Sequence, residues 1–229
     1  MIRAHIATYP PRLQMLEKSL ATIAPQVDQV FLCLNQFTEV PAFLSTYRNV
    51  TAVIPDEDFK DVGKFIFEPA PDDLVFMADD DLLYSPKHVR RLRRIGEKVG
   101  LKSGVFGVHG VVYRPQYESL IRKRISFHFE DPLVQTRRVH QLGTGTVLAL
   151  GRNVAPLEFM RGSQKFVDVR YARWLYSMGI SSWAIERPKG FIREIDPLNN
   201  DGETIYKTFT RRTPDYVLDE IRDFLDELP

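Results

Sequence analysis

The stretch from Asp72 to Pro86, D-D-L-V-F-M-A-D-D-D-L-L-Y-S-P, decides the fold of this chain. Leu74 to Ala78 form a short apolar run between two acidic clusters. A run of that length suits a strand that is covered on both faces in a parallel sheet. Asp79, Asp80 and Asp81 follow where this strand leaves the core. Because ligands bind beyond the carboxyl ends of strands in open α/β sheets, the stretch predicts an α/β fold with a binding site at the aspartates.

Three adjacent carboxylates repel one another, and a hard cation that neutralises them makes the arrangement favourable. Mg²⁺ and Mn²⁺ take oxygen ligands, commonly one or two carboxylates together with substrate phosphates. A solvated acidic turn that caps the following helix is the alternative interpretation. The triplet alone leaves both open.

The composition indicates one large α/β domain without a global charge bias. The chain has 229 residues, with 31 Lys and Arg against 30 Asp and Glu and a formal net charge of +1, so we expect no nucleic-acid partner. The single cysteine, Cys33, excludes an intramolecular disulfide and favours a reducing cytoplasm. No segment approaches 18 uninterrupted apolar residues, so neither a membrane span nor a signal peptide is expected, although peripheral contact with a membrane stays open.

The first half of the chain alternates strands with helical segments. Strands are predicted at 2–7, 30–34, 50–54, 74–78 and 105–108, the last continuing to 113, with helices at 13–23, 41–47 and 87–99. This alternation implies a mostly parallel sheet with right-handed crossovers. The helix at 87–99 has a basic surface, which is either a solvated face or a site for an anionic acceptor or a lipid headgroup.

The second half changes character. Shorter strands and loops are predicted across 122–140, then an apolar strand at 147–150, a helix at 166–178 and a final strand at 180–185. From Pro214 an amphipathic pattern predicts a C-terminal helix over 214–229, which docks on its own domain or on a partner. Its acidity argues against a membrane surface.

Several short motifs follow one another in an order that resembles a known group of proteins. They are Q-V-D-Q-V-F-L-C-L-N (26–35), D-V-G-K-F (61–65), D-D-D-L-L-Y-S-P (79–86), H-G (109–110), L-G-T-G-T (142–146) and V-D (167–168). Over residues 3 to 185 the chain resembles nucleotide-sugar glycosyltransferases of the GT-A fold, family 2, and in particular a bacterial and viral set of them. The resemblance implies a single catalytic domain over 1–213, with a nucleotide-binding half (about 1–113) and a smaller acceptor-side half (about 114–213).

The resemblance also implies which residues hold the donor. Thr8, Tyr9 and Arg12 follow the first strand, where the family binds the base and phosphates; tyrosine can stack on a base, and arginine can bind phosphate. Asn35 stands where the family often reads uracil with an aspartate. Lys64 could reach the diphosphate as a point charge. The structural alternatives are a packed turn for Tyr9 and an exposed helix-opening lysine for Lys64.

The aspartates and two further residues complete the implied site. Asp81 is assigned to Mn²⁺ or Mg²⁺, with Asp79 and Asp80 sharing metal, water and ribose contacts. Asp168 is the candidate base for an acceptor hydroxyl, with an ordinary helix cap as the alternative. His109 could ligate the metal or bind a phosphate, or be hydrogen-bonded in the fold.

The expected activity is metal-dependent transfer of a sugar from a nucleoside diphosphate sugar, UDP-linked, to a hydroxyl of a glycan or lipid-linked acceptor. One alternative is a sugar-phosphate nucleotidyltransferase, although such enzymes carry a glycine-rich basic loop after the first strand and residues 8–12 lack one. Another is a non-catalytic glycan-binding or scaffold domain that keeps a degenerate transferase fold.

Overall fold

The computed structural model of the chain describes residues 1–114, 117, 124–195 and 213–225. Three predicted features fall wholly or partly outside this range: the basic residues 122 and 123, part of the acceptor-side half, and residues 226–229 of the C-terminal helix. No helix among the described residues is long and apolar enough to cross a membrane.

An eight-stranded sheet runs through the molecule in the order β3-β2-β1-β4-β11-β6-β12-β9. Its strands are β1 (Ile2–Thr8), β2 (Gln29–Leu34), β3 (Val50–Val53), β4 (Leu74–Ala78), β6 (Gly104–Gly107), β9 (Arg137–Val139), β11 (Thr146–Leu150) and β12 (Ser181–Ala184). β1 to β4 run parallel to one another, and β6 runs parallel to β12. β11 is antiparallel to both β4 and β6, and β9 is antiparallel to β12. The predicted α/β class with a mostly parallel sheet is confirmed.

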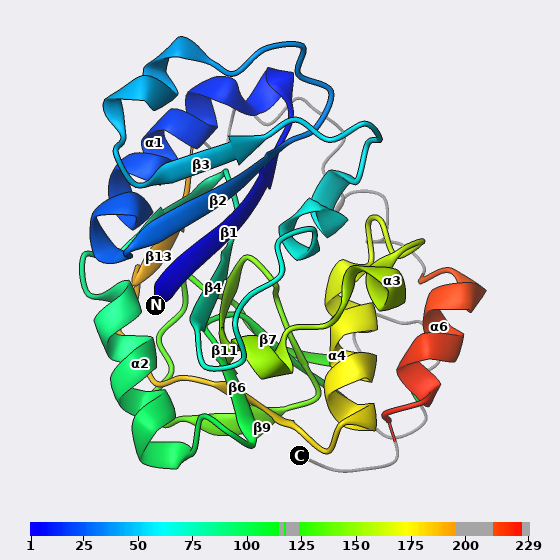
Figure 1. Cartoon of the computed structure of the whole chain (residues 1–229). Helices are drawn as coiled ribbons and strands as arrows, with labels where there is room; N and C mark the ends of the chain where they lie inside the picture. The colour runs from blue at the N-terminus through cyan, green and yellow to red at the C-terminus, as the bar shows by residue number, and fades with distance from the viewer. Residues whose placement is uncertain (115–116, 118–123, 196–212, 226–229) are drawn as a thin grey trace.

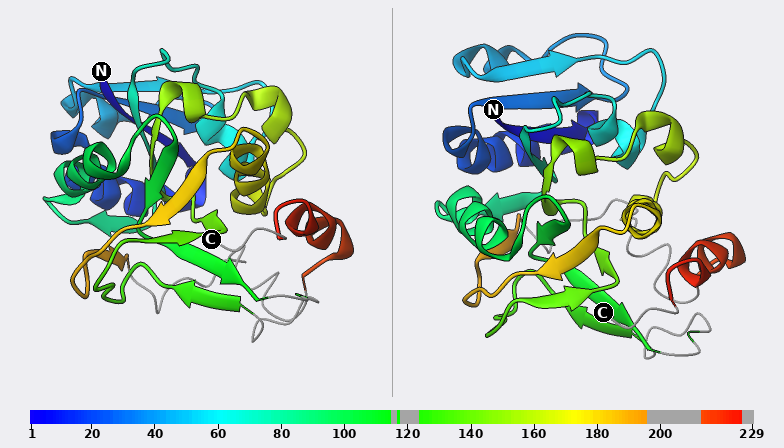
Figure 2. Two further views of the ribbon diagram at one scale, coloured as in Figure 1. Left: turned by 90° about the horizontal axis from the view of Figure 1, so that it is seen from below. Right: turned by 60° about the horizontal axis from the view of Figure 1, so that its bottom comes forward.

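β4 lies near the middle of the sheet and is covered on both faces. Phe76 and Ala78 belong to the core under α1 (Leu13–Ile23) and α2 (His88–Val99), whereas Val75 and Met77 belong to the core under α4 (Val167–Ser177). Figures 1 and 2 show α1 and α2 on one side of the sheet and α4 on the other. Burial on both faces explains why the strand is a continuous apolar run instead of an alternating one.

The predicted strand that continues from 105 to 113 is wrong, because the chain leaves the main sheet at His109. β6 ends at Gly107, and β7 (Gly110–Tyr113) joins β10 (Gln141–Leu142) and β8 (Arg124–Phe127) in a separate three-stranded sheet. Thr146 fixes the break, since its Oγ1 accepts hydrogen bonds from the N–H groups of Val108 and His109, at 3.2 and 3.0 Å.

A two-stranded sheet was not predicted. β5 (Leu82–Tyr84) pairs antiparallel with β13 (Ile192–Glu194), so the strand at 180–185, now β12, is not the final one. The pairing supports the aspartate turn, because the N–H of Ile195 donates to the carbonyl of Asp81 at 2.8 Å.

The remaining helices lie beside these sheets. The segment 41–47 contains a 3₁₀ turn (Ala42–Thr46), and two further short helical turns are η4 (Lys60–Phe65) and α3 (Leu157–Met160). The C-terminal helix α6 (Asp215–Arg222) packs on α4 of its own chain through Val217, Ile221 and Phe224. An ion pair between Arg170 and Glu220 joins the two helices.

The first prediction concerns His88, a buried histidine surrounded by the rings of Phe76, Tyr84 and Phe191. Among the described residues its Nδ1 has no hydrogen-bond partner, and burial lowers the pKa of the imidazole from 6.5 to about 3. As pH falls below 6.5, His88 binds a proton in the unfolded chain but remains neutral in the folded chain. The free energy of unfolding therefore falls by roughly 1.4 kcal/mol per pH unit from this group.

Urea unfolding of the wild type and of His88→Phe at pH 7 and pH 5 measures this contribution. The variant should lose less stability between the two pH values than the wild type, by about 1 to 2 kcal/mol. Equal losses would contradict the assignment.

Candidate functional site

Asp80 lies at the carboxyl ends of β1 and β4, where the register of the two parallel strands brings it beside Thr8. The Thr8 hydroxyl donates to Asp80 Oδ2 at 2.6 Å, and Arg12 Nη1 donates to Asp80 Oδ1 at 2.7 Å and to Asp81 Oδ2 at 3.0 Å. The Asp80 side chain is 4% exposed and that of Asp81 is 20% exposed. Asp80 thus holds the turn after β1 to the end of β4, whereas Asp81 remains accessible to a ligand.

Asp79 has the most accessible carboxylate of the three, with 39% of its side chain exposed. Its Oδ1 accepts from the buried Lys64 ammonium group. Its backbone is fixed as well: the Asp79 N–H donates to the Tyr84 hydroxyl at 2.7 Å, and this hydroxyl donates to the Gly145 carbonyl at 2.8 Å. Ser19 Oγ donates to the Asp79 carbonyl at 3.0 Å.

Two glycines make the close approaches around these groups. A Cβ on Gly145 would lie 1.8 Å from Asp79 Oδ2, so any side chain there would displace the carboxylate. A Cβ on Gly63 would lie 2.7 Å from Cys33 Sγ and 3.1 Å from Ala7 Cβ. Gly63 therefore lets η4 pack directly on β1 and β2 and brings the next residue, Lys64, under the aspartates.

Asp168 is joined to Lys64 through Thr144. The Thr144 N–H and Oγ1 donate to Asp168 Oδ1 at 2.8 and 2.7 Å, and Lys64 Nζ lies 3.5 Å from Thr144 Oγ1. α4 begins at Val167, so Asp168 lies inside the first turn and not at its N-cap. Burial raises the pKa of Asp168, with hydrogen bonds from Thr144 and the charge of Lys64 opposing the rise. Within the described residues Oδ2 has no hydrogen bond and is free to accept one.

Asp61 also helps to hold Lys64 and Asp168 in place. Both of its carboxylate oxygens lie 3.0 Å from the N–H of Lys165, a residue with φ of 75° just before α4. Burial raises the pKa of Asp61 to about 6, against the N–H of Lys165 and the charge of Lys64. Asp61 thus connects the turn that carries Lys64 to the helix that carries Asp168.

Tyr9 and Asn35 differ in how accessible they are. The Tyr9 ring is 36% exposed and has the Arg12 guanidinium 5.8 Å from its centroid. Asn35 is buried; its Nδ2 donates to the Lys60 carbonyl at 3.0 Å and its Oδ1 accepts from the Phe59 N–H at 2.9 Å. Tyr9 can meet a ligand as it stands, whereas Asn35 shapes the turn that leads into η4.

His109 lies between β6 and β7, with its ring centroid 5.6 Å from that of His128 and 6.2 Å from that of Phe129. Burial, followed by the charges of His128 and Arg187, lowers the pKa of His109 to about 3, so its imidazole is neutral at pH 7. Its Nδ1 is buried and has no hydrogen-bond partner among the described residues. The buried Arg187 guanidinium holds the adjacent loop by donating to the carbonyls of Phe127, His128, Asp131 and Ile185.

The site carries more carboxylates than cations. Asp79–Asp81 and Asp168 face Lys64 and Arg12, and burial together with the charge of Asp79 raises the pKa of Asp81 to about 7. Two accessible carboxylates with excess negative charge fit a hard divalent ion. In the described part of the chain no three His, Cys, Asp or Glu side chains form a metal-binding group, so such an ion would need substrate oxygens or water as further ligands.

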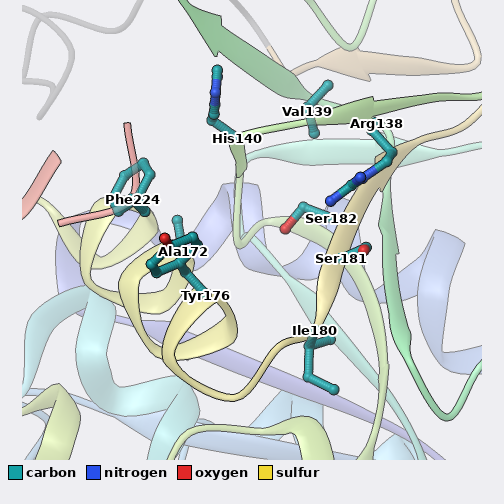
Figure 3. Close-up of a pocket in the computed structure, with 9 residues that line it drawn as sticks. All are labelled: Arg138, Val139, His140, Ala172, Tyr176, Ile180, Ser181, Ser182 and Phe224. Carbon is teal, nitrogen blue, oxygen red and sulfur yellow. The ribbon is translucent and has the colours of Figure 1, made fainter. Parts of the chain in front are cut away.

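A small hollow lies elsewhere, between α4, α6, β9 and β12 (Figure 3). Arg138, His140, Tyr176, Ser182 and Phe224 line it, and its volume is about 40 Å³. That is space for one or two water molecules and too little for a nucleotide.

The structure thus gathers the predicted Thr8, Arg12, Lys64, Asp79, Asp80, Asp81 and Asp168 into one connected cluster, with Tyr9 and Asn35 beside it and His109 at its flank. Sequence reasoning missed the connecting roles of Tyr84, Asp61, Thr144 and Arg187. Tyr84, Asp61 and Thr144 belong to the sequence motifs given above, and those motifs could have indicated their roles. No motif marks Arg187, because its partners are backbone carbonyls.

No protein-family model matches this chain, and no curated protein matches it. Solved structures do resemble it. A nucleotidyl transferase from Methanothermobacter thermautotroptrophicus aligns with a TM-score of 0.54 at 14% identity, over 96% of this chain and 98% of that chain. A fragment of S. aureus TarS, residues 1–349, aligns with a TM-score of 0.51 at 13% identity, over 97% of this chain and 72% of that one.

A longer S. aureus TarS chain aligns with a TM-score of 0.55 at 11% identity, over 96% of this chain and 42% of that chain. At such identities the similarity is one of fold alone. The chain therefore shares a GT-A-like α/β fold with these solved structures.

The second prediction tests the hydroxyl that fixes Asp79. Tyr84→Phe leaves the Asp79 N–H and the Gly145 carbonyl without their shared partner in a buried position. The free energy of unfolding, measured with urea, should fall by about 1 to 3 kcal/mol. The control Tyr216→Phe removes a hydroxyl from a tyrosine that is 56% exposed and should change it by less than about 0.5 kcal/mol. Equal effects would mean that the Tyr84 hydroxyl does not hold the turn.

Proposed function

We propose that this chain transfers a sugar from a nucleoside diphosphate sugar, UDP-linked, to a hydroxyl of a glycan or lipid-linked acceptor, with Mn²⁺ or Mg²⁺ as cofactor. One observation carries the proposal: beside the accessible carboxylate of Asp81, the accessible carboxylate of Asp79 is joined through Lys64 and Thr144 to a separate partly buried carboxylate, Asp168. A diphosphate site and a base are the two parts that such a transfer requires.

The donor side has named parts. Asp79 and Asp81 would hold the divalent ion, which supplies charge stabilisation for the departing diphosphate when bound. Tyr9 offers an exposed ring on which a base can stack, and Arg12 keeps N–H groups beyond the single nitrogen that bonds Asp80 and Asp81. Asn35, which the resemblance places near the base, bonds to backbone groups with both ends of its side-chain amide.

Asp168 is the base of the proposed reaction. Its Oδ1 is fixed by Thr144, and its Oδ2 takes the proton of the acceptor hydroxyl as the acceptor oxygen bonds to the anomeric carbon. The bond from that carbon to the diphosphate oxygen breaks, and its electron pair leaves with the diphosphate. A raised pKa, caused mainly by burial, makes Asp168 a better proton acceptor than a solvated aspartate. This single displacement inverts the anomeric configuration.

Nucleotidyl transfer to a sugar phosphate is the second candidate, favoured by the similarity to a solved nucleotidyl transferase over 98% of that chain. The Thr8–Arg12 turn contains no glycine and only a single basic residue, which argues against a loop that wraps a triphosphate. Pyrophosphate release from UTP and a sugar phosphate would favour this candidate over glycosyl transfer.

The third prediction tests the donor site by calorimetry. UDP should bind in the presence of Mn²⁺, and Asp81→Asn should weaken that binding by at least about tenfold, because an amide is a poorer ligand than a carboxylate. Asp72→Asn is the matched control, since the Asp72 side chain is 85% exposed and pairs with Arg152; this variant should bind UDP as the wild type does. Absence of UDP binding with and without Mn²⁺ would reject the proposed function and favour a scaffold role.

The fourth prediction tests the base. Asp168→Asn keeps an Oδ1 acceptor for Thr144, so UDP binding should persist while sugar transfer falls by roughly a hundredfold or more. Asp219→Asn, which alters an exposed residue of α6, should leave transfer unchanged. Full activity of Asp168→Asn would remove the base role, and loss of UDP binding would move Asp168 to the donor site. The anomeric configuration of the product, read by NMR, tests inversion.

A further inference from the structure

Helix α2 carries a stripe of positive charge that the proposed reaction does not use. Lys87, Arg91, Arg94 and Lys98 follow one another at helical spacing, with Arg90 beside them, so five cations fall within an arc of about 100°. Lys87, Arg90, Arg94 and Lys98 are exposed. Arg91 is partly buried and donates from Nε to the carbonyl of Glu186 at 2.8 Å.

The orientation of the stripe is fixed by the opposite side of the helix. Val89, Leu92 and Ile95 are buried in the core beneath the sheet, so α2 cannot rotate to hide its charges. Charge is also segregated across the molecule. Residues 87–102 hold seven Lys and Arg and only one acidic residue, Glu97, a net charge of +6, while the chain total is +1, which leaves −5 for the remainder.

In the part of the chain that the structure describes, the exposed cations of the stripe have no acidic partners. Within the described residues, no ion pair is formed by Lys87, Arg90, Arg94 or Lys98, whereas the neighbouring Arg93 pairs with Glu97 at 2.7 Å. Like charges four residues apart destabilise a helix, and Arg90 with Arg94 and Arg94 with Lys98 are such pairs. An anionic partner along this face would relieve the repulsion.

We propose that the exposed face of α2 binds the surface of a bilayer that contains anionic lipid. Clusters of four to eight Lys and Arg on an amphipathic helix are attracted to such surfaces, each cation adding to the affinity. Figures 1 and 2 show α2 and the acidic helix α6 on opposite sides of the molecule, so a planar surface can meet the stripe without meeting α6.

The shape and chemistry of the face favour a bilayer over a nucleic acid. The charges follow one straight helix of 12 residues, and the exposed large apolar residue on it is Val99, at 41%. No aromatic residue lies between His88 and Val99 on which an unpaired base could stack. The proposal does not depend on the proposed transferase function.

Co-sedimentation of the full chain with vesicles provides the test. We expect the chain to bind vesicles of phosphatidylcholine with 30% phosphatidylglycerol. Binding to vesicles of phosphatidylcholine alone, and binding in high salt, should each be weaker by about tenfold or more. The triple variant Arg90→Gln, Arg94→Gln, Lys98→Gln should lose at least about tenfold in binding. A matched triple variant, Arg152→Gln, Arg161→Gln, Arg222→Gln, removes the same charge from other surfaces and should retain binding.

Three results would overturn the proposal. They are absence of binding to the anionic vesicles at low salt, equal losses in the two triple variants, and displacement from vesicles by single-stranded RNA at equal phosphate concentration. Circular dichroism of each variant checks that the fold is kept, and since the altered side chains are exposed, we expect unchanged spectra.

Discussion

The pairing of three adjacent aspartates with two cations is the constraint on which the centre of this structure depends. Arg12 and Lys64 reach Asp79–Asp81 from two different turns, one after β1 and one before β4. Removing either partner from water is costly, and the cost is offset only where hydrogen bonds complete the geometry, as Thr8 does for Asp80. The parallel register of β1 and β4 supplies that geometry, so the site depends directly on the pairing of these strands.

The same pairing separates the aspartates into different roles. Asp80 is buried, and its carboxylate oxygens accept hydrogen bonds from Thr8 and Arg12, whereas the carboxylates of Asp79 and Asp81 remain accessible. Of three identical residues in a row, one thus has a structural role and two have carboxylates that can bind a ligand. Excess negative charge remains after the two cations are counted, and this property suits a divalent cation.

Connections between the two sides of the site run through polar groups of modest size. Thr144 bridges Lys64 to Asp168, and Asp61 fastens the Lys64 turn to the start of α4 through the backbone of Lys165. These hydrogen bonds connect four separate segments of the chain, at 61–64, 79, 144 and 165–168.

The sequence by itself determined the α/β class, the strand at 74–78 and a binding site at the aspartates, because these depend on local periodicity and on the rule that ligands bind beyond the carboxyl ends of the strands. The place of Thr8 and Arg12 beside the aspartates was implied by the family resemblance, and both residues bond to Asp80. Only the tertiary structure decided the break at His109, the β5–β13 pairing and the link from Lys64 through Thr144 to Asp168. These features join residues far apart in the chain. Local patterns carry no record of such partners, since long-range pairing is selected by the packing of the whole core.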